Sequence, residues 1–321
     1  MPKYDLSHLS RFAEANGAHS PPPFLNKHVV VVGATQGLGR AGAIKYAELG
    51  ASVVVAGRSE TAGVAVVEEM KRVTPAEAAQ TAKYHFLKLD VTSLDDVDEF
   101  SRKVSSLLPS IDYLHLSPGN SWLGPMRVSV DGYDATIQVQ YLGRAQLMLR
   151  LAPLIEKANG RILIILGGGF QRKIDFENDL DMVKDHGKMR RAQLPSLLMD
   201  SFATGFAERY PRLSVIHLYP GLALDPTPPS LSTLGFPSLL AWPIDCLISV
   251  AQKSGHFATT STMYSNALAY VGWHDDFGKG GLTNVNEDLT VYGPAPDAKD
   301  PEAVKKVYDW TVKVAKLDRP L

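Results

Sequence analysis

Residues 29–39 read VVVVGATQGLG, an unbroken apolar run followed directly by a turn with glycines at positions 33, 37 and 39. Four valines in a row are typical of a central parallel strand that is buried on both faces. Glycines after such a strand let the backbone turn tightly and let an anion approach the free N–H groups at the beginning of a helix. We therefore interpret this stretch as a strand, a phosphate-binding turn and the first turn of a helix.

Short apolar runs and helical stretches alternate from here to residue 218. Because strands that alternate with helices pair in parallel, the sequence predicts an α/β fold with a Rossmann-type, doubly wound parallel sheet in three layers. The expected strands are 29–32, 52–56, 84–89, 113–116, 161–166 and 213–218, and the expected helices lie at 39–49, 62–73, 94–108, within 132–157, and at 197–209, 238–252 and 301–315. We expect an N-terminal arm at 1–27 and one domain at 28–321, in which residues 222–321 cover the substrate.

The composition excludes several classes of partner. With 33 Lys and Arg against 34 Asp and Glu, there is no basic excess to attract nucleic acid or an anionic membrane. The single cysteine, Cys246, excludes an intrachain disulfide and a cysteine-ligated metal site, and we expect no metal.

The longest apolar stretch, 239–251, is interrupted by Pro243 and Asp245 and is too short to span a bilayer. Because the first residues carry charges and no apolar run, we expect a cytoplasmic protein without a signal peptide.

The spacing of the three glycines resembles the TGxxxGxG signature of the short-chain dehydrogenase/reductase family, with Val32 in place of the leading threonine. Further landmarks follow in the order of that family over roughly residues 28–225. Arg58 comes after the second strand, where an arginine resembles the members that prefer NADP(H), because its forked donors suit a 2′-phosphate. Asp90-Val91 resembles the pair that contacts adenine, and Pro220-Gly221 resembles the PG turn after the sixth strand.

The resemblance thus implies NADP(H) as the cofactor and a small molecule as the substrate. The cofactor-binding residues that it implies are Gly33, Thr35, Gln36, Gly37, Leu38, Gly39, Arg58, Asp90, Val91, Gly119, Pro220 and Gly221.

The catalytic pair of that family is missing from its usual place. The family's acid is a tyrosine four residues before a lysine on the fifth helix, where one helical turn puts both side chains on one face. Between Tyr141 and Tyr210 this sequence has no tyrosine. The one YxxxK match, Tyr84 to Lys88, lies in an expected strand, where four residues span roughly 13 Å. We therefore predict that Tyr84 and Lys88 are not catalytic.

Other family positions are also replaced. The tyrosine and lysine positions fall near Ala192 and Ser196, the serine position falls at Leu166 or Gly167, and the asparagine of the fourth helix becomes Gln140. The threonine after the PG turn becomes approximately Asp225. The stretches LSPG at 116–119, YLGR at 141–144 and HLYPG at 217–221 resemble a divergent group of fungal short-chain dehydrogenase-like proteins. Many of that group belong to specialised metabolism, and many lack YxxxK.

Several polar residues are candidates for replacement chemistry. On the fourth helix these are Gln140, Tyr141 and Arg144, with Tyr141 expected to face the cleft. Each candidate also has a structural interpretation: packing for Tyr141, an ion pair for Arg144, an exposed loop for His186 and a hydrogen-bonded core position for His217. The remaining candidates are Asn120 on the loop after the fourth strand, His186 in a charged stretch (182–191) that would form a lid, His217 at the end of the sixth strand, and Gly167–Gly169, which would make room for a bulky ligand.

Three functions stay open on this reasoning, because a fold alone does not decide among them. The first is an atypical enzyme of this family that acts on a small, largely apolar specialised metabolite and binds NADP(H). The second is a non-redox enzyme on the same scaffold, such as a cyclase, isomerase or dehydratase. The third is a non-catalytic NADP(H)-binding module. We also expect a homodimer or homotetramer, formed through the apolar runs 145–154 and 194–206.

Overall fold

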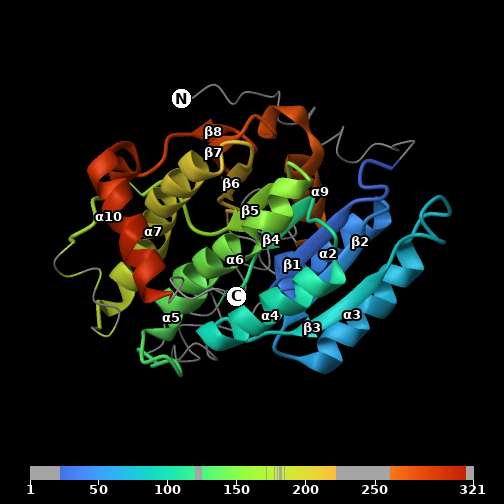
Figure 1. Ribbon diagram of the computed structural model, residues 1–321, viewed down its shortest axis with the longest axis horizontal. Coiled ribbons are helices and arrows are strands. Elements are labelled where there is room, and N and C mark those ends of the chain that lie inside the picture. The colour runs from blue at the N-terminus through green and yellow to red at the C-terminus, as the bar shows by residue number, and fades with distance from the viewer. Residues whose placement is uncertain are drawn as a thin grey trace, which may run out of the picture.

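The computed structural model describes residues 22–119, 125–170, 172–176, 178, 180, 183, 185–221 and 261–315. Within these residues one sheet runs through the molecule in the order β3-β2-β1-β4-β5-β6-β7-β8 (Figure 1). Its parallel strands are β1 (His28–Val32), β2 (Ser52–Gly57), β3 (Tyr84–Lys88), β4 (Tyr113–Leu116), β5 (Arg161–Ile165), β6 (Ser214–Leu218) and β7 (Gly281–Val285). The short β8 (Val291–Tyr292) pairs antiparallel with β7 at the edge of the sheet.

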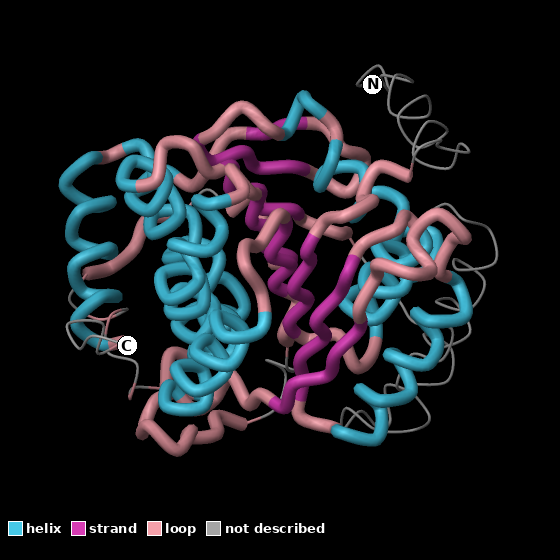
Figure 2. Tube along the Cα trace, turned by 45° about the vertical axis from the view of Figure 1, so that its right-hand side comes forward, coloured by secondary structure: helices cyan, strands magenta, loops and turns pink. Residues whose placement is uncertain are grey.

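Helices cover both faces of the sheet, so the molecule has three layers (Figure 2). One face carries α2 (Gly37–Glu48), α3 (Glu60–Val73) and α9 (Ser261–Trp273), and the other carries α4 (Leu94–Leu107), α6 (Gly143–Lys157) and α7 (Gly187–Arg209). The last helix, α10 (Pro301–Val314), packs against α7. The shorter helical elements are α5 (Ala135–Ile137), the π-helical η1 (Gln138–Leu142), η3 (Asp275–Phe277) and η4 (Pro296–Lys299). The predicted Rossmann-type α/β fold is confirmed.

Each face of the sheet has its own hydrophobic core, because successive residues of a strand point to opposite faces. In β1, Val30 and Val32 belong to the core shared with α4, α6 and α7, whereas Val29 and Val31 belong to the core shared with α2, α3 and α9. None of the four valines is more than 1% exposed. Burying one such side chain stabilises the fold by roughly 1.5–3 kcal/mol, so β1 firmly anchors the glycine turn that follows it.

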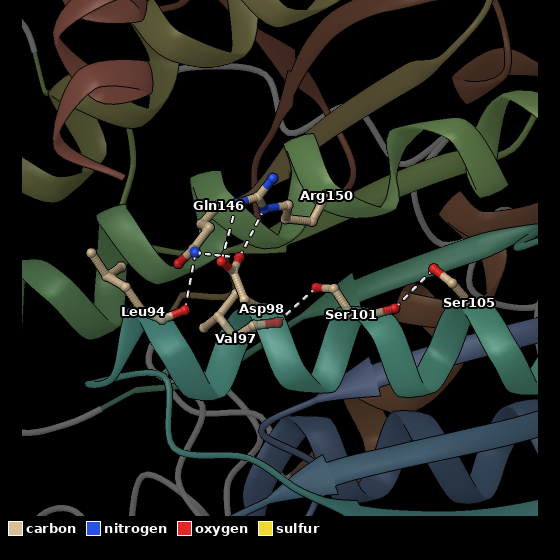
Figure 3. Close-up of polar contacts among 7 residues, drawn as sticks. All are labelled: Leu94, Val97, Asp98, Ser101, Ser105, Gln146 and Arg150. Atoms are coloured by element: carbon tan, nitrogen blue, oxygen red, sulfur yellow. Dashed lines mark hydrogen bonds and ion pairs between the residues drawn. The ribbon is translucent and has the colours of Figure 1, made fainter. Parts of the chain in front are cut away.

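A polar clamp joins α4 to α6 on the second face (Figure 3). The Asp98 carboxylate accepts hydrogen bonds from Arg150 Nε at 2.8 Å and Nη2 at 3.1 Å, and from Gln146 Nε2 at 2.7 Å. Gln146 Nε2 also donates to the Leu94 carbonyl at 3.0 Å. A charge-assisted pair of this forked geometry fixes direction as well as distance, and so sets how α6 lies along α4.

The helical layer differs from the sequence prediction at α7, which begins at Gly187 and not at residue 197. Residues 188–191, which are part of the stretch expected to form a lid, lie in the first turn of this helix. Lys, Met and Arg are good helix formers even without an apolar stripe. Proline usually ends a helix, but Pro195 lies inside α7. The prediction from apolar periodicity therefore began α7 ten residues too late.

The two ends of the domain also differ from expectation. Phe24, placed in the arm, is only 3% exposed and packs its ring against Tyr46 and Tyr113, so the folded domain begins before residue 28. Residues 261–315 supply α9, two strands and α10, and thereby extend the sheet and both helical layers. The expected helix at 238–252 lies outside the described residues. No helix among the described residues is long and apolar enough to cross a membrane.

The apolar runs expected to form a subunit interface are used within the single chain. Between Leu194 and Phe206, only Thr204 is not fully buried, and α10 covers part of this helix. The run 145–154 on α6 is buried as well, except at Leu149 and Pro153. The homodimer or homotetramer stays a prediction, and these runs no longer argue for it, because their apolar surface is already covered.

Candidate functional site

The turn after β1 requires its glycines. Gly33 and Gly37 have φ values of 82° and 56°, in the left-handed region that disfavours other residues. A Cβ atom on Gly33 would lie 2.6 Å from the backbone nitrogen of Pro118, and one on Gly39 would overlap the carbonyl oxygen of Gly33. The chain therefore closes tightly here, with the loop after β4 packed directly on the turn.

The beginning of α2 is available to bind an anion. Gln36, at the N-cap, forms no side-chain hydrogen bond to the helix, and the first turn contains no acidic residue. The free N–H groups and the helix dipole therefore present positive potential beside Gly37, Leu38 and Gly39. Thr35 packs against Gly57 at the end of β2. A Cβ atom on Gly57 would come 2.7 Å from the methyl group of Thr35.

The residues expected around the adenosine lie at the ends of neighbouring strands. Arg58 directly follows β2 and is exposed. Asp90 follows β3, and its Oδ1 accepts hydrogen bonds from Thr92 N at 3.0 Å and Thr92 Oγ1 at 2.8 Å. Val91 is 7% exposed and lies against Gly143 of α6. A Cβ atom on Gly143 would come 2.7 Å from the carbonyl oxygen of Val91.

The last members of the expected cofactor set complete this edge. Gly119, after β4, is exposed and faces open space, and Pro220 and Gly221, after β6, are half-buried. The carboxyl ends of parallel strands meet at one edge of such a sheet, which is where this fold binds dinucleotides. These residues fit a phosphorylated dinucleotide: unfilled helix N–H groups for the pyrophosphate, and the cationic Arg58 for a 2′-phosphate. Their role in binding stays a prediction.

Tyr141 does not face this edge, which corrects the expectation drawn from the sequence. Its side chain is 0% exposed, and its hydroxyl is hydrogen-bonded to Thr311 on α10. Its ring stacks on Trp310 and meets Phe202 edge-on, and burial raises the pKa of the hydroxyl. The π-helical η1 explains the error, because its wider turns break the spacing from which the face of the helix was predicted. Tyr141 is a packing residue between η1, α7 and α10.

Arg144 is a buried cation that holds backbone, and not the partner of a carboxylate. Its guanidinium donates to the carbonyl oxygens of Ile165 at 2.6 Å, Leu116 at 3.4 Å and Pro118. Burial lowers its pKa to about 9, so the group keeps its charge at neutral pH. Arg144 therefore ties the carboxyl end of β4 to that of β5, and positions the two loops that line the edge of the sheet.

The other candidates lie on several elements. Gln140 is buried within η1, His186 is half-buried immediately before α7, and Asn120 lies outside the described residues. Tyr84 and Lys88 lie on β3 as predicted, with the Tyr84 hydroxyl 2.7 Å from Thr74 Oγ1. The catalytic roles of Gln140 and His186 stay predictions. The described part of the chain holds no group of three or more His, Cys, Asp or Glu side chains arranged for a metal ion.

The space beside the glycines at 167–169 is filled by the chain itself. A Cβ atom on Gly167 would lie 3.3 Å from the ring of Phe170 and 3.4 Å from Ser196 Oγ. A Cβ atom on Gly168 would overlap the hydroxyl of Tyr292. Only Gly169, with φ at 72°, faces open space. The expectation that all three glycines make room for a ligand is therefore wrong for Gly167 and Gly168, because side chains from α7 and β8 occupy that room.

A buried acid–base pair lies behind these glycines. His217 Nδ1 lies 2.6 Å from Asp200 Oδ1, and its Nε2 lies 2.9 Å from the carbonyl oxygen of Gly167. Asp200 also accepts hydrogen bonds from Asn284 Nδ2 at 2.9 Å and from Ala295 N at 2.8 Å. Burial raises the pKa of Asp200, but the charge of His217 and these hydrogen bonds outweigh it and lower the pKa overall.

Both ring nitrogens of His217 are within hydrogen-bond distance of an oxygen atom, Asp200 Oδ1 on one side and the carbonyl oxygen of Gly167 on the other. The histidine is therefore a hydrogen-bonded core residue, and that interpretation of it is confirmed.

Sequence reasoning missed Tyr292, which reaches the site from the edge strand β8. Burial, followed by the charge of Asp200, raises the pKa of its hydroxyl to about 12, and the Asn284 side chain and the Gly169 backbone act in the opposite direction. The hydroxyl is buried and lacks a hydrogen-bond partner of normal geometry, as do Ser196 Oγ and Asn284 Oδ1. A two-residue strand carries no periodic signal, so nothing in the sequence pointed to Tyr292.

Known proteins resemble this chain in sequence. Residues 27–171 match the family model described as short chain dehydrogenase. An oxidoreductase from Emericella nidulans is 28% identical over 68% of this chain and 66% of its own length. A polyprenol dehydrogenase from Mus musculus is 33% identical over 52% of this chain and 48% of its own length. A short chain dehydrogenase/reductase from Annulohypoxylon moriforme is 32% identical over 45% of this chain and 43% of its own length.

Solved structures resemble it in fold. A hydroxysteroid dehydrogenase from Escherichia coli has a TM-score of 0.58 and 17% identity, and the match covers 86% of this chain and 100% of that one. A short-chain dehydrogenase/reductase variant from Serratia marcescens has a TM-score of 0.60 and 19% identity, and the match covers 83% of this chain and 99% of that one. Residues 27–171 are therefore similar in sequence to the short chain dehydrogenases, and fungal oxidoreductases are among the similar proteins. The chain matches only 43% to 66% of the length of the three relatives named above.

Proposed function

We propose that this protein is an atypical enzyme of the short-chain dehydrogenase/reductase family that binds NADP(H) and acts on a small, largely apolar metabolite. One contrast carries the proposal. The phosphate turn keeps the glycines and the unfilled helix N-terminus that a dinucleotide needs, whereas α7 offers neither a tyrosine nor a lysine at the positions of the usual catalytic pair.

Different parts of the cofactor are held by different residues. The turn from Gly33 to Gly39 holds the pyrophosphate on backbone N–H groups, Arg58 binds the 2′-phosphate, and Asp90 and Val91 enclose the adenine. Arg144 keeps the loops after β4 and β5 in place beside the turn. A bound nicotinamide would supply hydride chemistry at this edge of the sheet, so the chain itself must bind and orient the substrate.

An apolar substrate is the best fit to the relatives and to the site. The mouse relative is by its name a dehydrogenase of a polyprenol, which is a long hydrocarbon alcohol. Near Gly167 the neighbouring side chains are the ring of Phe170, which packs against the apolar core on this face, and Ser196. Apolar lining with a few polar groups is typical of small-molecule sites.

A second candidate function is a non-redox reaction, such as a cyclisation, isomerisation or dehydration. It is favoured by the filling of the space beside Gly167 and Gly168, where Phe170, Ser196 and Tyr292 stand in the region of the usual serine. In that case the pocket would guide a reactive substrate by shape, and the nucleotide would be structural or absent.

The test of the proposal combines binding with turnover. Calorimetric titration should show NADPH binding more tightly than NADH, with Arg58→Ala weakening NADPH selectively and Arg102→Ala, an exposed arginine on α4, serving as the control. A substrate-dependent change in the absorbance of reduced nicotinamide with apolar ketones or alcohols would then establish redox chemistry. Equal affinity for NADPH and NADH would reject the assignment of Arg58, and tight binding without turnover of any ketone or alcohol would favour the non-redox function.

A further inference from the structure

Strand β3 has one open side. It is the first strand in the order of the sheet and, among the described residues, pairs only with β2 (Figure 1). At one end of this pair Val53 N donates to Lys83 O at 2.9 Å, and at the other end Leu89 N donates to Gly57 O at 3.0 Å. Because successive residues of a parallel strand turn their backbone groups to opposite sides, every second residue of β3 points these groups away from β2. The outward N–H and C=O groups, to which no described residue is hydrogen-bonded, are those of Tyr84, Phe86 and Lys88.

A groove of about 580 Å³ lies along this edge, between β3 and α4. Its lining includes residues 85–87 of the strand, and Arg102, Lys103 and Leu107 of the helix. The residues 84–87 are all only half-buried, whereas the central strand β4 is buried throughout. Leu107 is 38% exposed. The described residues therefore leave room for a further strand beside β3.

Positive charge dominates the surface along this edge. Lys83 and Lys88 are exposed at the two ends of the strand. Arg102 and Lys103 are exposed beside the groove. The one acidic residue of the groove lining is Glu99, whose exposed carboxylate pairs with the exposed Lys103 Nζ at 2.6 Å, and a surface pair of this kind is weak enough to open. Charge complementarity therefore favours an acidic partner, whereas a second copy of β3 would bring the same cations into contact.

The two faces of the sheet differ beside this edge. On the face of α4 the groove presents Arg102 and Lys103. On the face of α3 the ring of Phe86 lies against Gly63, and the next residue, Val64, is 50% exposed. Because alternate residues of a strand point to opposite faces, an added strand would turn every second side chain toward the cations and the others toward the apolar side.

We propose that the free edge of β3 binds an extended segment of a partner protein, in which acidic residues alternate with apolar ones. The segment joins the sheet as a further strand. Its backbone pairs with the outward groups of Tyr84, Phe86 and Lys88, and its acidic side chains lie against Arg102 and Lys103. This surface runs along the side of a strand and not across the carboxyl ends at which we place the cofactor, so it does not rest on the proposed function.

Binding of a short probe peptide to the full-length protein tests the proposal. A fluorescein-labelled peptide of alternating glutamate and valine is titrated by fluorescence anisotropy, beside a peptide with lysine for glutamate and one that has the glutamates and valines in separate blocks. We expect saturable binding of the alternating acidic peptide alone. If the lysine or the block peptide binds equally well, if single-stranded DNA binds more tightly, or if the acidic peptide does not bind, the proposal is wrong.

Charge reversal locates the site of binding. Arg102→Glu combined with Lys103→Glu should weaken binding of the acidic peptide about tenfold or more, because two attractive contacts become repulsive. The control combines Lys279→Glu with Lys305→Glu, which changes the net charge equally at exposed positions before β7 and on α10, and it should bind as the wild type does. Equal weakening in both double variants would mean that only the net charge matters, and would contradict the assignment.

Amide hydrogen exchange followed by NMR distinguishes strand addition from attachment by charge alone. In the free protein the amides of Tyr84, Phe86 and Lys88 should exchange fast, whereas those of His85 and Leu87, which point to β2, should exchange slowly. The acidic peptide should slow the first set and leave the second unchanged. Outward amides that are already slow in the free protein would show that another part of the chain or a second copy covers this edge. That result, or peptide binding without slower exchange, would overturn the proposal.

Discussion

The Nδ1 atom of His217 lies 2.6 Å from the Oδ1 atom of Asp200, and this pair joins β6 to α7 directly behind Gly167. Asp200 also receives hydrogen bonds from Asn284 on β7 and from the backbone of Ala295. One carboxylate therefore fastens the C-terminal part of the sheet to the helical layer that contains α7. The edge at which we place the substrate depends on it.

Removing this charge should destabilise the protein strongly. In Asp200→Asn the buried His217 loses its counter-charge, and breaking a buried pair in this way costs about 3–5 kcal/mol. The free energy of unfolding in urea measures the loss, with Asp95→Asn, an exposed residue in the first turn of α4, as the control. A loss of less than 1 kcal/mol would mean that the pair is not ionised as we describe it.

The same pair predicts the direction of acid sensitivity. Because the folded state lowers the pKa of Asp200 below that of an unfolded aspartate, which is about 3.9, its contribution to stability is fully present at neutral pH. That contribution is lost as the pH falls through the folded pKa. Between about pH 5 and the acid limit, the wild type should lose stability more steeply than Asp200→Asn. Parallel curves for the two proteins would contradict this.

Arg144 should matter for both stability and nucleotide binding. In Arg144→Met three backbone carbonyls at the ends of β4 and β5 lose their donor, which should cost about 3 kcal/mol or more. NADPH affinity should fall as well, since the loop after β4 packs on Gly33. Arg144→Lys, which keeps the charge but not the forked donors, should recover part of both losses. Calorimetry and urea unfolding check this, and a stable Arg144→Met variant with unchanged affinity would show that the guanidinium does not position the loops.

Tyr84→Phe should leave nucleotide affinity and any turnover nearly unchanged. The residue is on edge strand β3, and its hydroxyl contacts only Thr74 among the hydrogen bonds of the described residues. Losing that bond should lower stability by about 1 kcal/mol. A hundredfold loss of turnover in a folded Tyr84→Phe variant would show instead that the YxxxK match on β3 is functional.

The sequence predicted the sheet well because its signals there are local. Four valines, the glycine turn and the apolar runs at 52–56, 113–116 and 161–166 mark parallel strands without reference to the rest of the chain. The six expected strands were placed to within a residue or two, whereas β7 and β8 were not predicted. The cofactor turn has the backbone conformation that its glycines imply.

The candidate site was harder to predict, because long-range contacts and a change of helical geometry decide it. Tyr141 was expected to face the cleft, and the π-helical η1 directs it into the aromatic cluster with Trp310 instead. Asp200 acquires its role from residues 284 and 295, which lie 84 and 95 positions further along the chain. Tyr292 reaches the site on a strand of only two residues. No pattern within a short window could reveal these relations.

We propose that the adenosine half of the cofactor site is intact while the catalytic half is replaced. Ser196, which falls near the lysine position of the family, is buried beside Gly167, so we expect no cation from this residue to bind the nicotinamide ribose. Losing such a charge-assisted hydrogen bond costs about 1.5–3 kcal/mol, which is roughly tenfold or more in affinity.

Side-by-side calorimetric titrations with NADPH and with 2′-phospho-ADP-ribose, which lacks the nicotinamide, test this claim most directly. We predict that intact NADPH binds no more than about tenfold better than the fragment, because the phosphate turn and Arg58 supply most of the affinity. If NADPH binds a hundredfold better, the nicotinamide pocket is fully formed and the account of a replaced catalytic half is wrong.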